Sequence, residues 1–457
     1  MKEATTLIVE SWATKSNCLH TIDDILAWIH EKNKSVRVNI RKIYLKDNDF
    51  WFYDNISGCI RNRTNSFFEI QGLQQSLDGK VLLEQPVIVQ NEIGYLGIIC
   101  KEFGGVLHFL MQAKTEPGNI NKVQISPTIQ ATKSNFTQKH GGDKPAYLDY
   151  FTNSGKYKII VDQIQSEQSS RFYKKRNRNI IIKVDESIEV LPSHMWMTLG
   201  QIKELLKIDN LVNMDTRTVL SCIPFYQTSD SIENIFHDNS LYHSIFNQQP
   251  VFLTSLYRYI NDYKMFDKVQ THLVPLTSLK SWSMKEGEFS CNDNSDFKVI
   301  FCDIEIEGRE VKHWVQPLFE AIGQATFGLL TCQENGVRKF LVHATPEVGC
   351  FDKIELGPAV QLEPSTSALK QADEVIEFFL NELESAKRIK YDVLLSEEGG
   401  RFYHEENRNT IIEINKSNIK RLPEGYFWVD YKTLNILMQI NNCVNIQLRT
   451  LLSLLEI

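Results

Sequence analysis

The densest polar stretch of the chain is Gln112-Ala-Lys-Thr-Glu-Pro-Gly-Asn119. Alternate side chains of a β-strand point to the same face, so Gln112, Lys114 and Glu116 would share one face of a strand. An amide, an ammonium and a carboxylate on one face can bind a polar ligand or move a proton. A solvated edge strand is an equally good interpretation of the spacing alone. We therefore take Lys114 and Glu116 as candidate catalytic residues, and Gln112 and Asn119 as candidate substrate contacts.

A second polar face follows in the segment QISPTIQAT, residues 124–132. Uncharged hydrogen-bonding side chains alternate there with apolar or small ones, as on a strand. The candidate substrate contacts in this segment are Gln124, Thr128, Gln130 and Thr132. Such a face suits sugar hydroxyls or the edge of a base. An outward-facing strand is the alternative interpretation.

The loop that comes next reads NFTQKHGG, residues 135–142. It holds a histidine beside two glycines, so His140 is a third candidate catalytic residue. Asn135, at the start of the loop, is a candidate substrate contact. A lone histidine in a loop is more often an ordinary surface residue, and that alternative stays open.

One decapeptide occurs twice, as SRFYKKRNRN at 170–179 and as GRFYHEENRN at 400–409. Arginine can bind phosphate oxygens with two parallel hydrogen bonds, although a structural ion pair would use the same geometry. The candidate contacts are Arg171, Tyr173, Arg178 and Asn179 in the first copy, with Arg401 and Arg408 as counterparts in the second. The first copy has three further basic residues where the second has His-Glu-Glu, which favours phosphate near the first copy.

The repeat extends over the whole chain. Residues 109–135 align without a gap to residues 340–366, and nine of the 27 positions are identical. Chance would give roughly two identities, so an internal duplication is the better explanation. Each half shows a helix, short alternating strands, a longer helix, a strand and a last helix, which predicts an α+β domain. We expect domains at 1–223 and 251–457, joined by a polar, aperiodic linker at 224–250.

Composition narrows the class of protein. A formal net charge of −7 argues against a general nucleic-acid binder. The sequence shows no signal-peptide core and no apolar run of membrane-spanning length. Its nine cysteines are scattered without a Cys-x-x-Cys pair, which indicates reduced thiols in a cytoplasmic protein. Motifs for a P-loop, a Rossmann cofactor site or a metal centre are missing as well.

The segments HFLMQAKTEPGN, VQISPTIQAT and SNFTQKHGG, together with the paired RFY…NRN motif, resemble the NDP-hexose 2,3-dehydratase family. The resemblance runs from about residue 20 to the C-terminus. It implies a tandem duplication of a Nudix-like α+β domain, a homodimer, and a nucleotide-diphosphate 4-keto-6-deoxyhexose as substrate, with dTDP-4-keto-6-deoxyglucose expected. It also implies loss of the C2 hydroxyl and formation of a C3 ketone without redox cofactor or metal. The acidic helix of Nudix hydrolases is missing from both halves, so the resemblance implies the scaffold without hydrolysis.

The two halves differ where chemistry is expected. Gln112-Ala-Lys114 becomes His343-Ala-Thr345, and Asn119 becomes Cys350. We therefore expect the productive pocket in the first half. The second pocket, which we expect to be degenerate or auxiliary, would hold His343, Glu347, Gln361, Arg401 and Arg408. Two other functions remain open: a non-catalytic nucleotide-sugar binding or regulatory protein, and an atypical Nudix-type diphosphatase.

Overall fold

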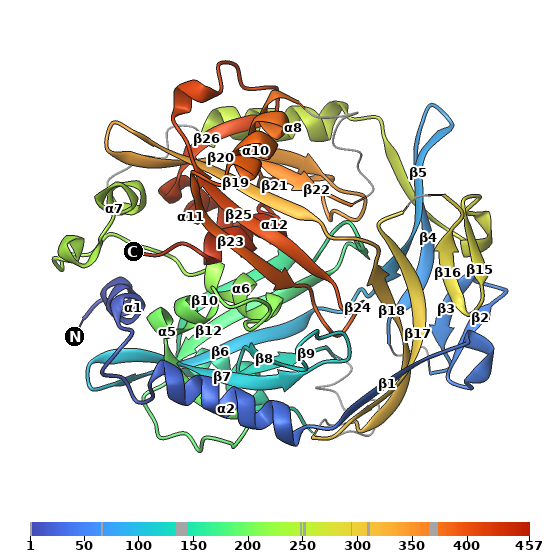
Figure 1. The fold of residues 1–457 in the computed structure, drawn as a ribbon, viewed down its shortest axis with the longest axis horizontal. Coiled ribbons are helices and arrows are strands. Elements are labelled where there is room, and N and C mark those ends of the chain that lie inside the picture. The colour runs from blue at the N-terminus through green and yellow to red at the C-terminus, as the bar shows by residue number, and fades with distance from the viewer. Residues whose placement is uncertain are drawn as a thin grey trace.

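The computed structural model describes the chain in several stretches. These are residues 2–64, 67–133, 144–246, 249, 253–293, 295–308, 311–364 and 373–457. In this part of the chain the strands form four sheets, two of seven strands and two of six, and helices pack against them (Figure 1). The mixture of separate helices and mainly antiparallel sheets confirms the predicted α+β class.

The two seven-stranded sheets repeat one pattern. The first contains β6 (Gly94–Phe103), β7 (Val106–Thr115), β8 (Val123–Ser126), β9 (Ile129–Ala131), β10 (Lys158–Ser166), β12 (Arg176–Lys183) and β13 (His194–Thr198). The second contains β19 (Thr326–Glu334), β20 (Val337–Pro346), β21 (Ile354–Pro358), β22 (Val360–Leu362), β23 (Ile389–Ser396), β25 (Glu406–Glu413) and β26 (Tyr426–Asp430). β12 pairs in parallel with β6, and β25 pairs in parallel with β19. The topology therefore confirms the internal duplication.

The two six-stranded sheets exchange a strand between the repeats. One contains β2 (Trp51–Asp54), β3 (Cys59–Asn62), β4 (Glu69–Leu77), β5 (Lys80–Val89) and β11 (Phe172–Tyr173), with β14 (Gln270–Val274) from the second repeat added beside β4. The other contains β15 (Trp282–Lys285), β16 (Glu288–Cys291), β17 (Phe297–Ile306), β18 (His313–Ala321) and β24 (Phe402–Tyr403), with β1 (Val38–Ile43) from the first repeat added beside β17. Figure 1 shows β1 leaving α2 and reaching β17. Each repeat thus completes a sheet of the other.

Helices follow the same duplication. The first repeat has α1 (Ala4–Ala13), α2 (Ile22–Ser35), α4 (Leu148–Thr152), α5 (Leu199–Leu205) and α6 (Met214–Ser221). The second has α7 (Asn239–Phe246), α8 (Leu253–Phe266), α10 (Glu374–Ser385), α11 (Tyr431–Met438) and α12 (Ile446–Ser453). Short 3₁₀ turns lie at η1 (Leu45–Asp47), η2 (Ser154–Lys156), η3 (Glu233–Ile235), η4 (Leu276–Ser278) and η5 (Lys416–Asn418). No helix among the described residues is both long and apolar enough to cross a membrane.

The segment that we expected to be an aperiodic linker contains helix α7. Ser244 of α7 donates a hydrogen bond to the carbonyl of Arg338, as Ser11 of α1 does to the carbonyl of Leu107. α7 is therefore the counterpart of α1 and belongs to the second repeat. The sequence pattern did not predict this helix, because the helix is short and its buried face includes the small polar residues Ser240 and Ser244.

A shared interior joins the repeats. One apolar cluster includes residues from α1 and β7 of the first repeat and from β20 and α12 of the second. Two buried arginines cross the boundary: Arg217 of α6 donates to the carbonyl of Ser396 at 2.6 Å, and Arg449 of α12 donates to the carbonyl of Ser166. Each arginine therefore fixes the end of a strand in the opposite repeat, close to the segments described next.

Candidate active site

Glu116 lies in a hydrogen-bonded chain at the end of β7. Gln130 donates through Nε2 to Glu116 Oε1 at 3.1 Å, and Asn213 donates through Nδ2 to Gln130 Oε1 at 3.3 Å. Lys114 Nζ is 3.6 Å from the same Glu116 oxygen and donates to the carbonyl of Gln130 at 3.2 Å. The Lys114 side chain is only 11% exposed. The predicted polar face therefore exists as a buried ion pair held by two amides.

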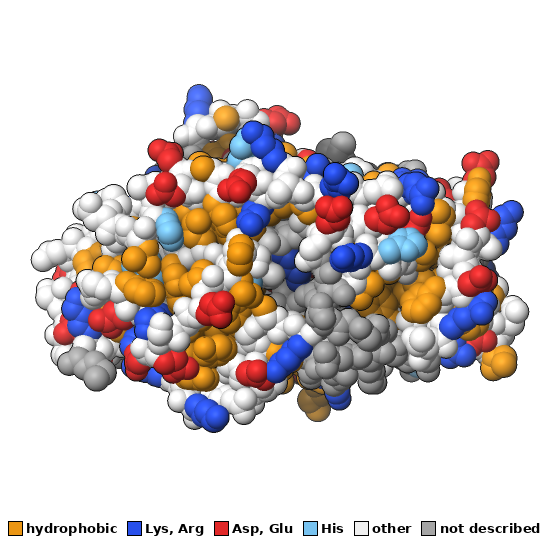
Figure 2. Space-filling view, turned by 90° about the horizontal axis from the view of Figure 1, so that it is seen from below, with side chains coloured by type: hydrophobic (Ala, Val, Ile, Leu, Met, Phe, Trp, Pro, Cys, Tyr) orange, Lys and Arg blue, Asp and Glu red, His pale blue; other side chains and the backbone are white. Residues whose placement is uncertain are grey.

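A cavity of about 340 Å³ lies beside this pair. Gln112, Lys114 and Gln130 line it, together with the end of α2 and with Glu307 and Gly308 of the second repeat. Figure 2 shows the molecule from the side of α2, where the surface is hollowed near its middle and carries basic side chains in and around the hollow. The volume is within the range of small-ligand sites.

The turn after β7 docks on the second repeat. The Gly118 amide donates to the carbonyl of Gly399 at 2.7 Å, and the His404 amide donates to the carbonyl of Gly118 at 2.9 Å. A Cβ at Gly118 would lie 1.6 Å from the carbonyl oxygen of Phe402, so the contact requires glycine. The loop between β23 and β24 thereby forms one wall of the site around Glu116.

That wall contains two glutamates that sequence reasoning missed, and it also contains Arg401, which we expected in the second pocket. Glu397 accepts a hydrogen bond from Asn407 Nδ2 at 2.8 Å, and the half-buried Glu398 follows it. Arg401 donates to the carbonyl of Gly400 at 2.7 Å and to Gln90 Oε1 at 3.1 Å. The sequence did contain one indication of these groups, because the segment Glu-Glu-Gly-Gly at 397–400 differs from its counterpart Glu-Gln-Ser-Ser at 167–170.

The second repeat preserves the amide chain but not the lysine. Gln361 donates to Glu347 Oε1 at 2.9 Å, and Asn445 donates to Gln361 Oε1 at 3.1 Å. Thr345 stands in the place of Lys114. Burial, with the nearby Glu355 as a further cause, raises the pKa of Glu347 to about 8. His343 stacks on the ring of Tyr426 with 4.1 Å between ring centroids.

The repeated motif crosses between the repeats, which corrects one expectation. Arg171 donates to Glu363 Oε2 of the second repeat at 3.1 Å, and its guanidinium lies 4.3 Å from the ring centroid of Phe297. Arg401, by the same symmetry, lies beside the first repeat. We expected Arg171 to serve the first pocket and Arg401 the second, but the structure places them the other way round, because each RFY segment packs against the opposite repeat.

Three further candidates use their polar groups within the fold. Arg178 makes a two-fold ion pair with Asp162 on the neighbouring strand, at 2.6 Å for both contacts, and Arg408 repeats it with Asp392. Asn179 donates to the carbonyl of Asn177 at 3.1 Å. The structural interpretation of these side chains is therefore the better one.

Two members of the second polar face also hold the fold together. Thr128 faces the cavity, but its hydroxyl donates to the carbonyl of Leu110 at 2.5 Å and accepts from the Ile99 amide at 2.9 Å. Gln124 is buried and donates to Ser396 Oγ of the second repeat at 2.7 Å. Both side chains therefore brace the strands and the repeat boundary around the site.

The remaining candidates that the structure describes are Asn119, Thr132 and Tyr173. Asn119 donates to the carbonyl of Lys122 at 2.8 Å and so closes the turn after Glu116. Thr132 is half-buried just beyond β9, and Tyr173 is half-buried in β11, next to β5. Asn135 and His140 lie outside the described residues. Among the residues that are described, no group of three His, Cys, Asp or Glu side chains is arranged to hold a metal ion.

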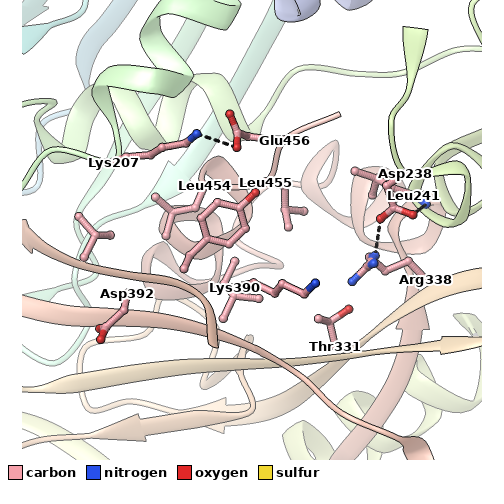
Figure 3. Close-up of a pocket in the computed structure, with 13 residues that line it drawn as sticks. Lys207, Asp238, Leu241, Thr331, Arg338, Lys390, Asp392, Leu454, Leu455 and Glu456 are labelled. Carbon is pink, nitrogen blue, oxygen red and sulfur yellow. Dashed lines mark hydrogen bonds and ion pairs between the residues drawn. The ribbon is translucent and has the colours of Figure 1, made fainter. Parts of the chain in front are cut away.

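Another cavity, of about 440 Å³, lies at the edge of the second repeat (Figure 3). Its charged residues form ion pairs: Arg338 with Asp238 at 2.8 Å, and Lys207 with Glu456 at 2.8 Å. None of the candidate residues from the sequence lines it. The convergence of predicted and observed polar groups therefore places the candidate active site at Glu116.

Comparison with known proteins agrees with this geometry. A family model described as NDP-hexose 2,3-dehydratase matches residues 22–223 and again 253–455. A dTDP-4-dehydro-6-deoxy-alpha-D-glucopyranose 2,3-dehydratase from Saccharopolyspora spinosa is 38% identical over 417 residues, covering 89% of this chain and 85% of the relative. Proteins of the same name from Amycolatopsis orientalis and Streptomyces violaceoruber are each 36% identical, covering 98% and 93% of this chain and 92% and 95% of the relatives. The chain therefore belongs to the NDP-hexose 2,3-dehydratase family.

Proposed function

We propose that this protein catalyses the 2,3-dehydration of dTDP-4-keto-6-deoxyglucose in deoxysugar biosynthesis. The product is the dTDP-linked 3,4-diketo-2,6-dideoxyhexose. One observation carries the proposal on the structural side: Lys114 and Gln130 line a cavity of about 340 Å³, and both contact the buried Glu116. The family match over both repeats and the names of the relatives give the substrate class.

The reaction needs a base, an acid and support for an oxyanion. The C4 ketone acidifies the C3 proton, and we assign its removal to Glu116. The enolate oxygen at C4 is then stabilised by the Lys114 ammonium, a fixed charge in a water-poor site. Protonation of the departing C2 oxygen releases water and leaves a C2–C3 enol. Ketonisation of this enol at C3 completes the product, with no net oxidation or reduction.

We extend the proposal to the organisation of the molecule. Each repeat would be a Nudix-like domain, the first with the productive pocket and the second with an auxiliary one. The chain would act as a homodimer in the cytoplasm, with neither redox cofactor nor metal. The depleted polar face of the second pocket, with Thr345 in place of Lys114, supports the division of roles. Light scattering coupled to size-exclusion chromatography would test the dimer.

Incubation with dTDP-4-keto-6-deoxyglucose tests the activity. The proposed dehydratase releases one water and leaves the diphosphate intact, which mass spectrometry of the trapped diketosugar detects. Formation of thymidine monophosphate would instead indicate a diphosphatase. Binding without either product would indicate a sensor. A repeat of the assay with EDTA should leave the rate unchanged, and a loss restored by magnesium would contradict the metal-free assignment.

A further inference from the structure

The second repeat places a carboxylate, that of Glu398, close to Glu116 of the first repeat. A methyl group at Gly400 would lie 3.2 Å from Oε1 of Glu398 and 3.3 Å from Oε1 of Glu116. These two distances place the carboxylate oxygens within about 6.5 Å of each other. Glu398 as a whole residue is half-buried. Two carboxylates from different repeats thus lie on either side of one glycine.

Two glycines make this approach sterically possible. A Cβ at Gly399 would lie 2.1 Å from Asn119 Oδ1, so a side chain there would displace the turn that carries Glu116. The corresponding loop of the first repeat has Ser169 in this position, and the turn opposite it has the smaller Cys350 in place of Asn119. The smaller residue Gly399 thus faces the larger Asn119, and the larger Ser169 faces the smaller Cys350. The two residues of each contact therefore compensate each other in size.

The carboxylate itself occurs in only one of the two pockets. The counterpart of Glu398 is Gln168, which donates to Glu405 Oε1 of the second repeat at 3.4 Å. The counterpart of Glu405 is Lys175, whose ammonium donates to the carbonyl of Glu92. An ionisable acid beside basic residues therefore faces Glu116, whereas a neutral amide occupies the equivalent place in the second pocket.

We propose that Glu398 is the acid that protonates the departing C2 hydroxyl, so that the active site is shared between the two repeats. This inference rests on the proposed dehydration. As the C2–O bond breaks, Glu398 transfers its proton to the oxygen and water leaves, while Glu116 holds the proton taken from C3. On ketonisation, the C3 enol hydroxyl returns a proton to Glu398, and Glu116 delivers its proton to C2. Both residues then regain their starting forms, and the protons balance.

The electrostatics of the site agree with an acid at this position. Burial raises the pKa of Glu398, and the nearby Glu116 raises it further, whereas Arg401, Lys175 and Lys114 act in the opposite direction. The pKa values of two more buried carboxyls, Asp215 and Glu167, are affected by Glu398. Burial is the main cause of the raised pKa of Asp215 and of Glu167, and Glu398 adds to both shifts. The cluster therefore favours a proton on one of its carboxyls at neutral pH.

Replacement of Glu398 by glutamine tests the assignment, with exchange of the C3 hydrogen as the readout. In heavy water, wild-type enzyme should incorporate deuterium at C3 of the remaining substrate and should also release the C2 hydroxyl. Glu398→Gln should retain the C3 exchange and bind the nucleotide sugar within a few-fold, but release of the hydroxyl should fall by about 10²-fold or more, as expected for a lost general acid. Glu116→Gln should lose both steps, because the base acts first. Gln168→Asn is the matched control and should leave both steps unchanged.

Three results would overturn the inference. Unchanged turnover in Glu398→Gln would remove any catalytic role, and joint loss of exchange and turnover with intact binding would make Glu398 the base or a positioning residue. If Glu398→Gln unfolds at a lower temperature than the wild type, Glu398→Asp provides the second measurement. We expect this variant to release the hydroxyl more slowly and to show a shifted alkaline limb in the pH profile of the rate. A pH profile identical to that of the wild type would count against the assignment. A wild-type protein that neither exchanges nor dehydrates would refute the proposed function itself, which is a distinguishable failure.

Discussion

At the scale of single residues, the partner of the central glutamate differs between the two pockets. Both have a glutamate bound by a glutamine, which is in turn bound by an asparagine. Only Glu116 has a lysine ammonium, at 3.6 Å. Glu347 has Thr345 instead, and its pKa is raised to about 8 by burial and by Glu355. The glutamate of the first pocket is therefore paired with a cation, whereas the raised pKa of Glu347 favours its protonated form at neutral pH.

The first prediction compares the two glutamates. Glu116→Gln should lower turnover by about 10²–10⁴-fold, the usual contribution of a general base. Glu347→Gln, the matched control, should retain turnover because its pocket lacks the lysine. Steady-state rates and melting temperatures of both variants provide the measurement. Near-normal activity in Glu116→Gln, with loss in Glu347→Gln, would move the active site to the second repeat.

The second prediction concerns stability against pH. A carboxyl whose pKa is raised on folding binds more protons in the folded state than in the unfolded state, so stability falls as pH rises between the two pKa values. For Glu347 that window runs from the ordinary glutamate pKa of 4.5 to about 8. The melting temperature of the wild type should therefore decline from pH 5 to pH 8 more steeply than that of Glu347→Gln. Equal slopes in a thermal-shift series would contradict the raised pKa.

The third prediction concerns the two buried arginines. Arg401 holds the carbonyl of Gly400 beside Glu116 and Glu398, so Arg401→Lys should lower turnover several-fold or more. Lysine cannot reproduce the two-directional hydrogen bonding of a guanidinium. Arg171→Lys should lose similar thermal stability with a smaller effect on turnover, because Arg171 contacts the second repeat. A larger loss of turnover in Arg171→Lys would restore the assignment based on sequence alone.

Individual residues show how far the sequence could predict the site. The alternation of Gln112, Lys114 and Glu116 predicted a shared face, and the ion pair and cavity bear out that geometry because strand periodicity is a local property. Arg171 was assigned to the wrong pocket because its partner Glu363 lies 192 positions away. Glu398 was missed for the same reason. Sequence spacing contains no information on contacts that cross from one repeat to the other.

At the scale of elements, the turn after β7 determines the placement of Glu116. Gly118→Ala should destabilise the protein and lower turnover, because its Cβ would lie 1.6 Å from the carbonyl oxygen of Phe402. Overpacking of this kind costs about 1–3 kcal/mol. Gly155→Ala is the control, since no atom lies within 4 Å of a Cβ there. Chemical denaturation of both variants provides the measurement, and equal stability would show that the turn can move away from its neighbour.

The elements also show the limit of prediction from the alignment. The gapless repeat predicted matching strands in both halves, and the two seven-stranded sheets confirm this because equal sequence patterns form equal ladders. The exchange of β1 and β14 was not predictable. An alternating strand can pair with either of two similar sheets, and the choice depends on the path of the chain between repeats. The short helix α7 was missed because its buried polar residues mask the apolar period.

At the scale of the whole molecule, the exchanged strands make the repeats interdependent. Residues 1–223 alone would lack β14 beside β4, and their own β1 would lack its partner β17. Unpaired sheet edges of this kind promote aggregation. The first repeat alone would also lose the loop with Glu398 and Arg401. Neither half should therefore form the active site by itself, although the first has the Lys114–Glu116 pair.

Expression of separate fragments tests this interdependence. Residues 1–223 alone should aggregate or melt without a cooperative transition and should show no turnover, whereas co-expression with residues 224–457 should restore measurable dehydration. The control for a broken chain is a full-length protein with a protease site engineered into the exposed residues 229–231. After cleavage at this site the protein should remain assembled and active. A fragment 1–223 that melts cooperatively as a monomer and dehydrates the nucleotide sugar would refute both the structural role of the exchanged strands and the shared active site. Activity only after both fragments combine would support them, because β14 completes a sheet of the first repeat and the loop with Glu398 docks on the turn that carries Glu116.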